Sequence, residues 1–137
     1  AWKEKIDLRV KELDLEKKIS IEPETGNVGE LLSQVNVGLV VSDREGLPVA
    51  LLEYGLAGLA VISTEVGQCP EVLAKGSLGL LVKPGEPESL AKAMQQFLLE
   101  KEWVVNTGEL FQSHVEKNYG AEGFLNSYFR LISTPAN

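Results

Sequence analysis

The chain has 137 residues, of which 44% are hydrophobic and 24% charged, so it can form one domain with its own core. Surface scaling predicts roughly 7,000 Å² of exposed area after folding. The net charge of −7 argues against general binding to nucleic-acid phosphates or anionic membranes. One cysteine and one histidine exclude an internal disulfide, a multi-thiolate zinc site and a histidine-rich metal site. No apolar run approaches the ~20 residues of a membrane span, which favours a cytoplasmic protein.

The amino-terminal part of the chain predicts two helices and a strand. Apolar residues at helical spacing predict an amphipathic surface helix over residues 2–14. A short strand is predicted at 18–22, before a proline and a turn-forming segment. Asn27 followed by Glu30 resembles a capping box and predicts a short helix to about Val35.

From residue 37 onward, short apolar strands alternate with helices. Residues 37–41 are apolar without alternation, which is typical of a parallel strand buried on both faces. Pro48 suits the first position of a helix that Gly58 ends. Further strands are predicted at 60–63 and 79–82, and further helices at about 70–76, 90–98, 102–118 and 121–132. The alternation predicts an α/β fold with a Rossmann-like parallel sheet flanked by helices.

Parallel sheets of this kind bind ligands outside the carboxyl ends of their strands, so the loops after Val41, Ser63 and Val82 are the functional candidates. The first of these loops leads into a helix whose amino terminus favours an anion, usually a phosphate. Pro48 has no N–H, so the donors would be the amides of Gly46, Leu47 and Val49.

Two carboxylates accompany this anion site. Glu45 precedes the helix, and Glu53 lies within it among apolar residues. An unpaired carboxylate is costly to bury, so Glu53 must be solvent-facing, paired or ligand-bound. Carboxylates beside a phosphate site are good acceptors for sugar hydroxyls. Spacing alone favours a structural interpretation, in which Glu53 is a solvated surface residue and Glu45 a helix-terminus charge.

The motifs around this pair form an ordered run. Residues 42–63 read SDREGLPVALLEYGLAGLAVIS and contain Glu45 and Glu53 in the pattern Glu-x7-Glu; TEVGQCPEVL and GLLVKPGEPESLAKAM follow. This order resembles the carboxyl-terminal, donor-binding domain of GT-B retaining glycosyltransferases of family 4, glycosyl transferases group 1. The resemblance covers about residues 3–132. Departures such as Leu47-Pro48 after the Glu-Gly pair leave the donor sugar open.

The resemblance implies transfer of a sugar from a nucleotide-diphosphate donor, with retained configuration, to a glycan or lipid-linked acceptor. It implies that Glu53 holds the ribose hydroxyls and that Glu45, the candidate catalytic residue, contacts the transferred sugar. Gly46, Leu47 and Val49 would meet the diphosphate or the sugar through their amides. No metal or other cofactor is expected. The family's common setting is polysaccharide or lipopolysaccharide assembly on the cytoplasmic face of a bacterial membrane, which implies a cytoplasmic protein that can act peripherally at the inner membrane face.

The resemblance also implies that residues 1–137 form a single partial domain. No Lys or Arg occurs between Glu45 and Ala74, although a leaving diphosphate needs cations, which the family supplies near its first strand. We expect a fragment that lacks the first strands and the amino-terminal, acceptor-binding domain, and that is inactive alone. An open sheet edge would then permit self-association. The helix at 121–132 would cross to the other domain.

Two alternatives belong to other classes. Asp43, Thr64 and Lys83 occur in the order of the aspartate, hydroxyl and lysine of a phospho-acceptor receiver domain, although the acidic pair that binds magnesium there is absent. A non-catalytic module that binds sugar nucleotides is the other alternative. Met94 and Phe97 are predicted to form part of a core stripe, and Trp103 to be a packing residue or an interdomain contact. The other polar candidates are interpreted as structural or surface residues: His114, Cys69, Glu65 and Glu71.

Overall fold

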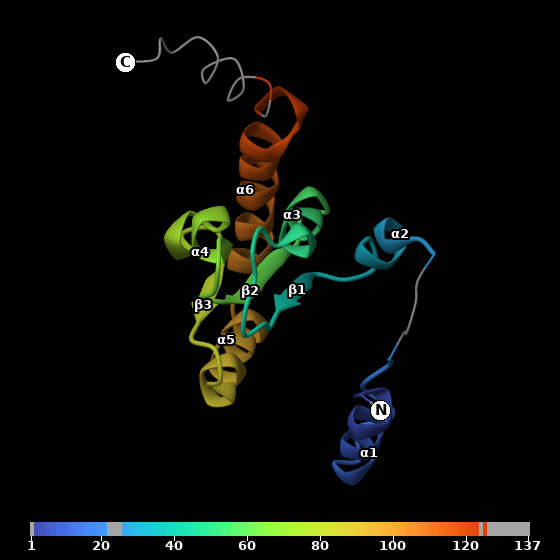
Figure 1. Cartoon of the computed structure of the whole chain (residues 1–137). Helices are drawn as coiled ribbons and strands as arrows, with labels where there is room; N and C mark the ends of the chain where they lie inside the picture. The colour runs from blue at the N-terminus through green and yellow to red at the C-terminus, as the bar shows by residue number, and fades with distance from the viewer. Residues whose placement is uncertain (1, 22–25, 124, 126–137) are drawn as a thin grey trace.

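The computed structural model describes residues 2–21, 26–123 and 125, and it places a small sheet among helices (Figure 1). In chain order the elements are α1 (Trp2–Glu12), α2 (Val28–Leu32), β1 (Val37–Val40), α3 (Val49–Leu56), β2 (Ala60–Thr64), α4 (Cys69–Val72), the 3-10 turn η1 (Ala74–Gly76), β3 (Leu80–Val82), α5 (Pro87–Leu99) and α6 (Lys101–Tyr119). The α/β class predicted from the sequence is therefore confirmed. The predicted helix at 121–132 lies largely outside the described residues.

The strands form a parallel sheet in the order β1-β2-β3. Val40 lies opposite Ser63, and Thr64 lies opposite Val82, so the carboxyl ends of the strands meet at one edge of the sheet. Every residue of the central strand β2 is buried. The loops that follow β1 and β2 are consequently neighbours in space.

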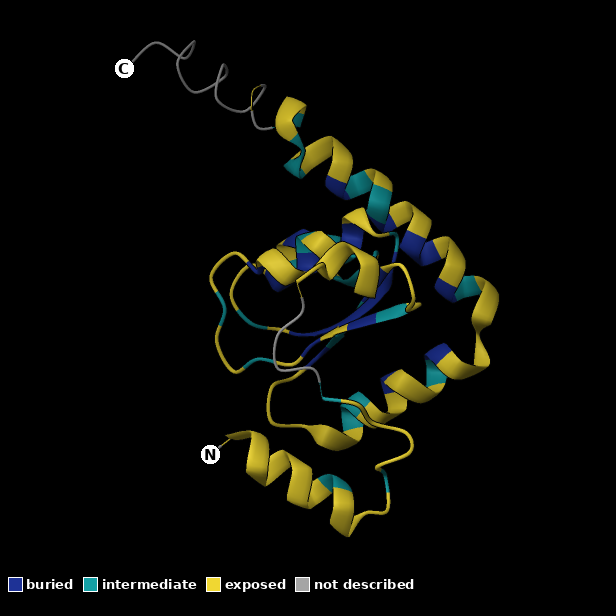
Figure 2. Ribbon diagram, turned by 90° about the vertical axis from the view of Figure 1, so that its right-hand side faces the viewer, coloured by how far each residue is buried: buried dark blue, intermediate teal, exposed yellow. Residues whose placement is uncertain are grey.

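Helices cover both faces of the sheet, and successive residues of β2 point to opposite faces. Val61 packs with Leu51 of α3 and Phe111 of α6 in one buried cluster. Ile62 packs in a second cluster, which includes Phe97 of α5. Figure 2 shows this arrangement as a dark-blue sheet between helices whose outer faces are exposed.

Several local signals act as predicted. The Asn27 side chain caps α2 by accepting a hydrogen bond from the Glu30 amide, at 3.1 Å, although the helix ends at Leu32, before the predicted end. Gly58 follows the end of α3 with a φ of 71°, a conformation that glycine adopts without steric cost. Trp103 contacts the ring of Phe97, with centroids 5.2 Å apart, and is thus a packing residue.

Three other predictions are wrong. Residues 18–21 form no strand, because no described strand pairs with them and an unpaired strand has no ladder of hydrogen bonds. Strand β1 is not buried on both faces, since it lies at the edge of the sheet and Leu39 is 37% exposed. Met94, expected in the core with Phe97, is 44% exposed.

The exposed area is larger than expected. The surface measures 10218 Å², against the roughly 7,000 Å² that scaling predicts for a compact domain of this mass. Helix α1 contributes to the excess, because none of its residues is buried and it stands apart from the sheet in both views (Figures 1 and 2). No helix in the described part of the chain is long and apolar enough to span a membrane.

Candidate functional site

The loop between β1 and α3, residues 41–48, lies at the carboxyl end of the sheet and carries the first predicted carboxylate. Glu45 is partly buried there. Its Oε1 accepts a hydrogen bond of 2.6 Å from the Oγ of Ser42, the second residue after β1. One carboxylate oxygen is thus occupied by a neighbour within the same loop, and the second oxygen has further acceptor capacity.

The end of β2 holds this loop through the side chain of Thr64, which is only 2% exposed. Thr64 Oγ1 accepts a hydrogen bond from the Ser42 amide at 3.1 Å and donates to the Ser42 carbonyl at 2.7 Å. A longer contact of 3.4 Å joins the same oxygen to the carbonyl of Val40. The hydroxyl therefore takes the place of a backbone partner just beyond the point where β1 and β2 stop pairing.

The loop between β2 and α4 supplies a second attachment. The main-chain N–H of Gln68 donates a hydrogen bond to the carbonyl of Gly46 at 3.1 Å. Gly67 lies against the same segment, with a φ of 51°, and a β-carbon at this position would overlap the carbonyl oxygen of Glu45. The turn that contains Glu45 and Gly46 is thus attached to β2 at one end and to the β2–α4 loop at the other.

The predicted amide donors lie in the turn before α3 and at its first residue. Within the described ranges, no carbonyl or side chain accepts a hydrogen bond from the amides of Gly46, Leu47 or Val49. Pro48 precedes the helix as its N-cap residue and offers no N–H. Free amides at a helix amino terminus attract anions through their partial positive charge and the helix dipole. The chemistry of this turn therefore suits a phosphate group.

The second predicted carboxylate, Glu53, lies on the exposed side of α3. It stands four residues after Val49, which is 63% exposed, so the two share one face of the helix. Helical side chains tilt toward the amino terminus, which directs Glu53 toward the turn with the free amides. Among residues 26–123, no hydrogen bond or ion pair joins its carboxylate to another side chain.

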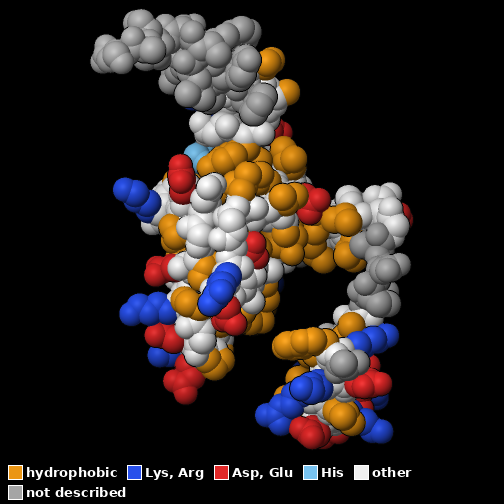
Figure 3. Space-filling model, viewed as in Figure 1, with side chains coloured by type: hydrophobic (Ala, Val, Ile, Leu, Met, Phe, Trp, Pro, Cys, Tyr) orange, Lys and Arg blue, Asp and Glu red, His pale blue; other side chains and the backbone are white. Residues whose placement is uncertain are grey.

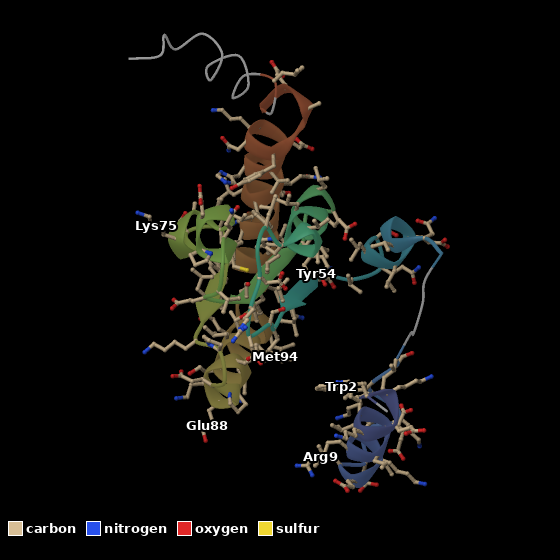
Figure 4. The ribbon with its side chains drawn as sticks, in the orientation of Figure 1. Trp2, Arg9, Tyr54, Lys75, Glu88 and Met94 are labelled. Atoms are coloured by element: carbon tan, nitrogen blue, oxygen red, sulfur yellow. The ribbon has the colours of Figure 1, made fainter. Side chains whose placement is uncertain are left out.

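Positive charge is sparse around this turn. Arg44 and Lys83 are both exposed, at the ends of β1 and β3. An open pocket of about 630 Å³ adjoins the β2–α4 loop and includes Gly67, Glu71 and Lys75 among its lining residues. The side chain of Lys75 extends outward from the protein body in Figure 4. The described residues therefore provide amides for an anion, and few cations.

Glu71 also acts on a tyrosine at the end of α6. Burial raises the pKa of Tyr119, and the negative charge of Glu71 raises it further. Glu71 itself is exposed, as is Glu65, in agreement with their interpretation as structural or surface residues.

Cys69 is fully buried at the start of α4, within the core. His114 is partly buried, and its Nδ1 lies 3.1 Å from the side-chain Nδ2 of Asn118.

Another pocket lies beside the amino end of β1. It has a volume of about 790 Å³, and its mostly apolar lining includes Val37, Met94, Leu98 and Val105. Met94 is visible near the base of β1 in Figure 4, and hydrophobic side chains also gather over α3 and toward α2 in Figure 3. Lys101 is the one ionisable side chain among the residues that line this pocket. The carboxylates and free amides make the opposite end of the strands the better candidate site.

The predicted residues of the alternative phospho-acceptor site are placed differently. The hydroxyl of Thr64 is engaged by Ser42 and is buried, whereas Asp43 and Lys83 are exposed. No group of three His, Cys, Asp or Glu side chains that could hold a metal ion occurs among the described residues.

Sequence reasoning missed the supports of the site, namely Ser42, Thr64 as a loop anchor, Gly67 and Gln68. A signal was available for two of them. Ser42 is a hydroxyl residue three positions before Glu45, and Thr64 is a polar residue at the end of an otherwise apolar strand. Their pairing could not be read from local sequence, because it depends on the register between β1 and β2.

Comparison with known proteins gives consistent results. The sequence profile of the family described as glycosyl transferases group 1 matches residues 1–110. The N-acetyl-alpha-D-glucosaminyl L-malate synthase of Bacillus anthracis is 31% identical over 119 residues, which are 87% of this chain and 31% of that protein.

Two solved structures share the fold. HepE of Anabaena, in complex with UDP, has a TM-score of 0.87 at 17% identity, over 95% of this chain and 36% of HepE. Sucrose-phosphate synthase of Thermosynechococcus elongatus has a TM-score of 0.79 at 24% identity, over 95% of this chain and 34% of that protein. The chain thus spans about a third of the length of these proteins. With a family profile that covers most of its residues, the chain belongs to the glycosyl transferases group 1 family.

Proposed function

We propose that this chain is the donor-binding part of a retaining glycosyltransferase, which transfers a sugar from a nucleotide-diphosphate sugar to a glycan or lipid-linked acceptor. The observation that carries the proposal is the turn before α3. It combines the free amides of Gly46, Leu47 and Val49 with the carboxylate of Glu45, and Glu53 lies one helical turn further on. Family membership and the UDP complex of HepE support a nucleotide-linked donor.

Each group has a role that suits its chemistry. The amides face the diphosphate or the sugar, because they are uncommitted donors at a helix amino terminus. Glu53 accepts hydrogen bonds from the ribose hydroxyls, and its exposed, unpaired carboxylate is available for them. Glu45 accepts hydrogen bonds from the transferred sugar. Transfer then depends on positioning and on electrostatic stabilisation of the leaving diphosphate.

The proposal includes a second region of the full-length protein. The chain spans about a third of its relatives, and the site has few cations. An upstream region would supply the cations and the acceptor-binding domain, so the isolated chain is expected to be inactive. The unpaired edge of β1 would otherwise be open to a second copy of the chain. Action in the cytoplasm, in some cases at the inner membrane face, belongs to the same proposal.

A binding titration of the full-length protein tests the proposal. Uridine, guanosine and adenosine diphosphates and their sugars are titrated into the wild type, Glu53→Gln and a control, Glu109→Gln, which changes an exposed carboxylate on α6. We expect one nucleotide to bind selectively, Glu53→Gln to weaken that binding, and the control to leave it unchanged. Absence of binding by every nucleotide, or equal affinity in Glu53→Gln and the wild type, would contradict the proposal.

The isolated chain is titrated in parallel with the full-length protein. If the full-length protein binds a nucleotide and the isolated chain does not, binding needs groups from the upstream region, where the proposal places the cations. Equal affinity in both would mean that residues 1–137 hold the nucleotide unaided. Sedimentation of the isolated chain at several concentrations tests its self-association.

A further inference from the structure

We propose that Ser42 and Thr64 are positioning residues that set the orientation of the Glu45 carboxylate toward the transferred sugar. The inference rests on the proposed function of Glu45 and goes beyond it, because neither Ser42 nor Thr64 is itself placed against the donor. It follows from the hydrogen bonds that connect the end of β2, through the first residues of the loop, to a carboxylate oxygen.

The first step is the attachment of Ser42 to β2. A β-ladder that continued past Val40 would use backbone groups of Thr64, but the chain leaves the sheet and the Thr64 side chain bonds both the amide and the carbonyl of Ser42. A single hydroxyl that both accepts and donates on one residue restricts the position of that residue and the orientation of its peptide groups. Because Thr64 is 2% exposed, water competes little for these bonds.

The second step runs from Ser42 to Glu45. The Ser42 Oγ donates to Glu45 Oε1 at 2.6 Å, a short distance that is typical of a hydroxyl bound to a carboxylate. A glutamate without this partner would sample several rotamers and would lose that freedom on binding a sugar. With Oε1 held, the carboxylate plane is oriented before the ligand arrives, and Oε2 remains to accept from a sugar hydroxyl.

The third step concerns the far end of the turn. Gly67 lies beneath the Glu45 carbonyl, and Gln68 holds the carbonyl of Gly46 at 3.1 Å. The main chain at Glu45 is therefore held from the side of the β2–α4 loop as well. The side chain depends on Ser42 for its orientation, so loss of the Ser42 hydroxyl alters the carboxylate while these main-chain contacts persist.

A double-mutant cycle on the full-length protein tests the inference. Ser42→Ala, Glu45→Gln and the double variant are compared with the wild type by titration with the nucleotide-sugar and with the bare nucleotide. We expect Ser42→Ala to weaken nucleotide-sugar binding about threefold to tenfold, the effect of one net hydrogen bond. The bare nucleotide should bind nearly as before. Ser42→Ala should have a smaller effect in the Glu45→Gln background, because the Ser42 hydroxyl there meets a neutral amide oxygen in place of a carboxylate.

Thr64→Val and Thr64→Ser test the anchor. Thr64→Val removes the hydroxyl with little change in shape and should reproduce the loss seen in Ser42→Ala, whereas Thr64→Ser keeps the hydroxyl and should restore binding. Ser63→Ala is the matched control, because Ser63 is also buried and its hydroxyl donates to the Thr64 carbonyl, at 3.1 Å, and not to the loop that carries Glu45. Thermal unfolding of each variant identifies any loss that reflects instability of the fold.

The outcomes separate the inference from the function on which it rests. If Glu45→Gln weakens nucleotide-sugar binding while Ser42→Ala weakens both ligands equally, or adds fully to Glu45→Gln, the positioning role is overturned and the role of Glu45 stands. If Glu45→Gln leaves nucleotide-sugar binding unchanged, the proposed function of Glu45 fails and the positioning role fails with it. Failure of Thr64→Ser to restore binding would overturn the role of the Thr64 hydroxyl.

Discussion

Gly67 lies directly against the main-chain carbonyl of Glu45, so that a side chain at residue 67 would occupy the space of that oxygen. The contact joins the loop after β2 to the loop after β1. Gly67 also has a φ of 51°, which residues with a β-carbon adopt only with strain. The close approach of the two loops at the candidate donor site therefore requires glycine for two independent reasons.

Gly67→Ala is accordingly expected to lower both stability and donor affinity. Gly85 is a matched control, because its φ is 76° and nothing lies within 4 Å of the point that a β-carbon would occupy there. Gly85→Ala should cost only the backbone term of about 1–2 kcal/mol, whereas Gly67→Ala should cost more and displace Glu45. Denaturant unfolding and nucleotide-sugar titration measure the two effects. Similar losses of stability in both variants would contradict the predicted overlap with Glu45.

Glu45→Gln should separate the sugar from the nucleotide. The variant keeps the shape of the side chain and removes its charge. Because Glu45 is proposed to contact the transferred sugar, we expect weaker nucleotide-sugar binding and slower turnover. The bare nucleotide, for which the amides and Glu53 are the proposed partners, should bind almost normally. Parallel titrations with the two ligands check this. Equal losses for both would argue that Glu45 serves the nucleotide.

Phe111→Ala should be among the most destabilising substitutions in this chain. Phe111 is fully buried between the sheet and α3, and its ring approaches Gly55. Removal of a buried phenylalanine ring typically costs about 3–5 kcal/mol. The neighbouring Leu110→Ala is the control, because Leu110 is 60% exposed and should cost far less. Denaturant unfolding of the two variants gives the comparison, and similar midpoints would contradict the assignment of the core.

Tyr119 should ionise at a higher pH than an ordinary tyrosine, because burial and then Glu71 raise its pKa above 10.0. The unfolded chain loses this proton first, so the contribution to stability is complete below pH 10 and is lost as the pH rises through the folded pKa. Ultraviolet titration of the wild type minus Tyr119→Phe isolates the phenol. Glu71→Gln should lower the pKa but leave it raised, because burial is the larger cause. A midpoint of the difference titration at or below pH 10 would contradict the raised pKa of Tyr119.

The elements that could be predicted are those specified by neighbouring residues. Strand β2 begins with three apolar residues and ends in two small hydroxyl residues, a composition that suits its full burial. The end of α3 follows from Gly58, and the start of α2 follows from the Asn27 side chain. The position of Glu45 at the carboxyl end of a strand follows from the alternation of strands and helices.

The features that could not be predicted depend on partners distant in the sequence. Residues 18–21 have the composition of a strand and form none, since a strand exists only when another strand pairs with it. Leu39 is apolar enough for a core but lies on an edge strand, where burial depends on a neighbour. The contact of Thr64 with Ser42 depends on the parallel register of β1 and β2, and no local sequence pattern predicts that register.

The turn before α3 is held at two points, at Ser42 by the Thr64 hydroxyl and at Gly46 by the main-chain amide of Gln68. Asp43 and Arg44 lie between these points and are exposed. The span of the loop is thus set by the sheet and by the β2–α4 loop, and the exposed side chains of Asp43 and Arg44 take no part in these two attachments. Substitutions of Asp43 and Arg44 would change the charge near the donor and leave both attachments of the loop in place. An insertion between the attachments would break one of them. A library that varies donor preference should therefore replace Asp43 and Arg44, keep Glu45 and keep the length of the loop.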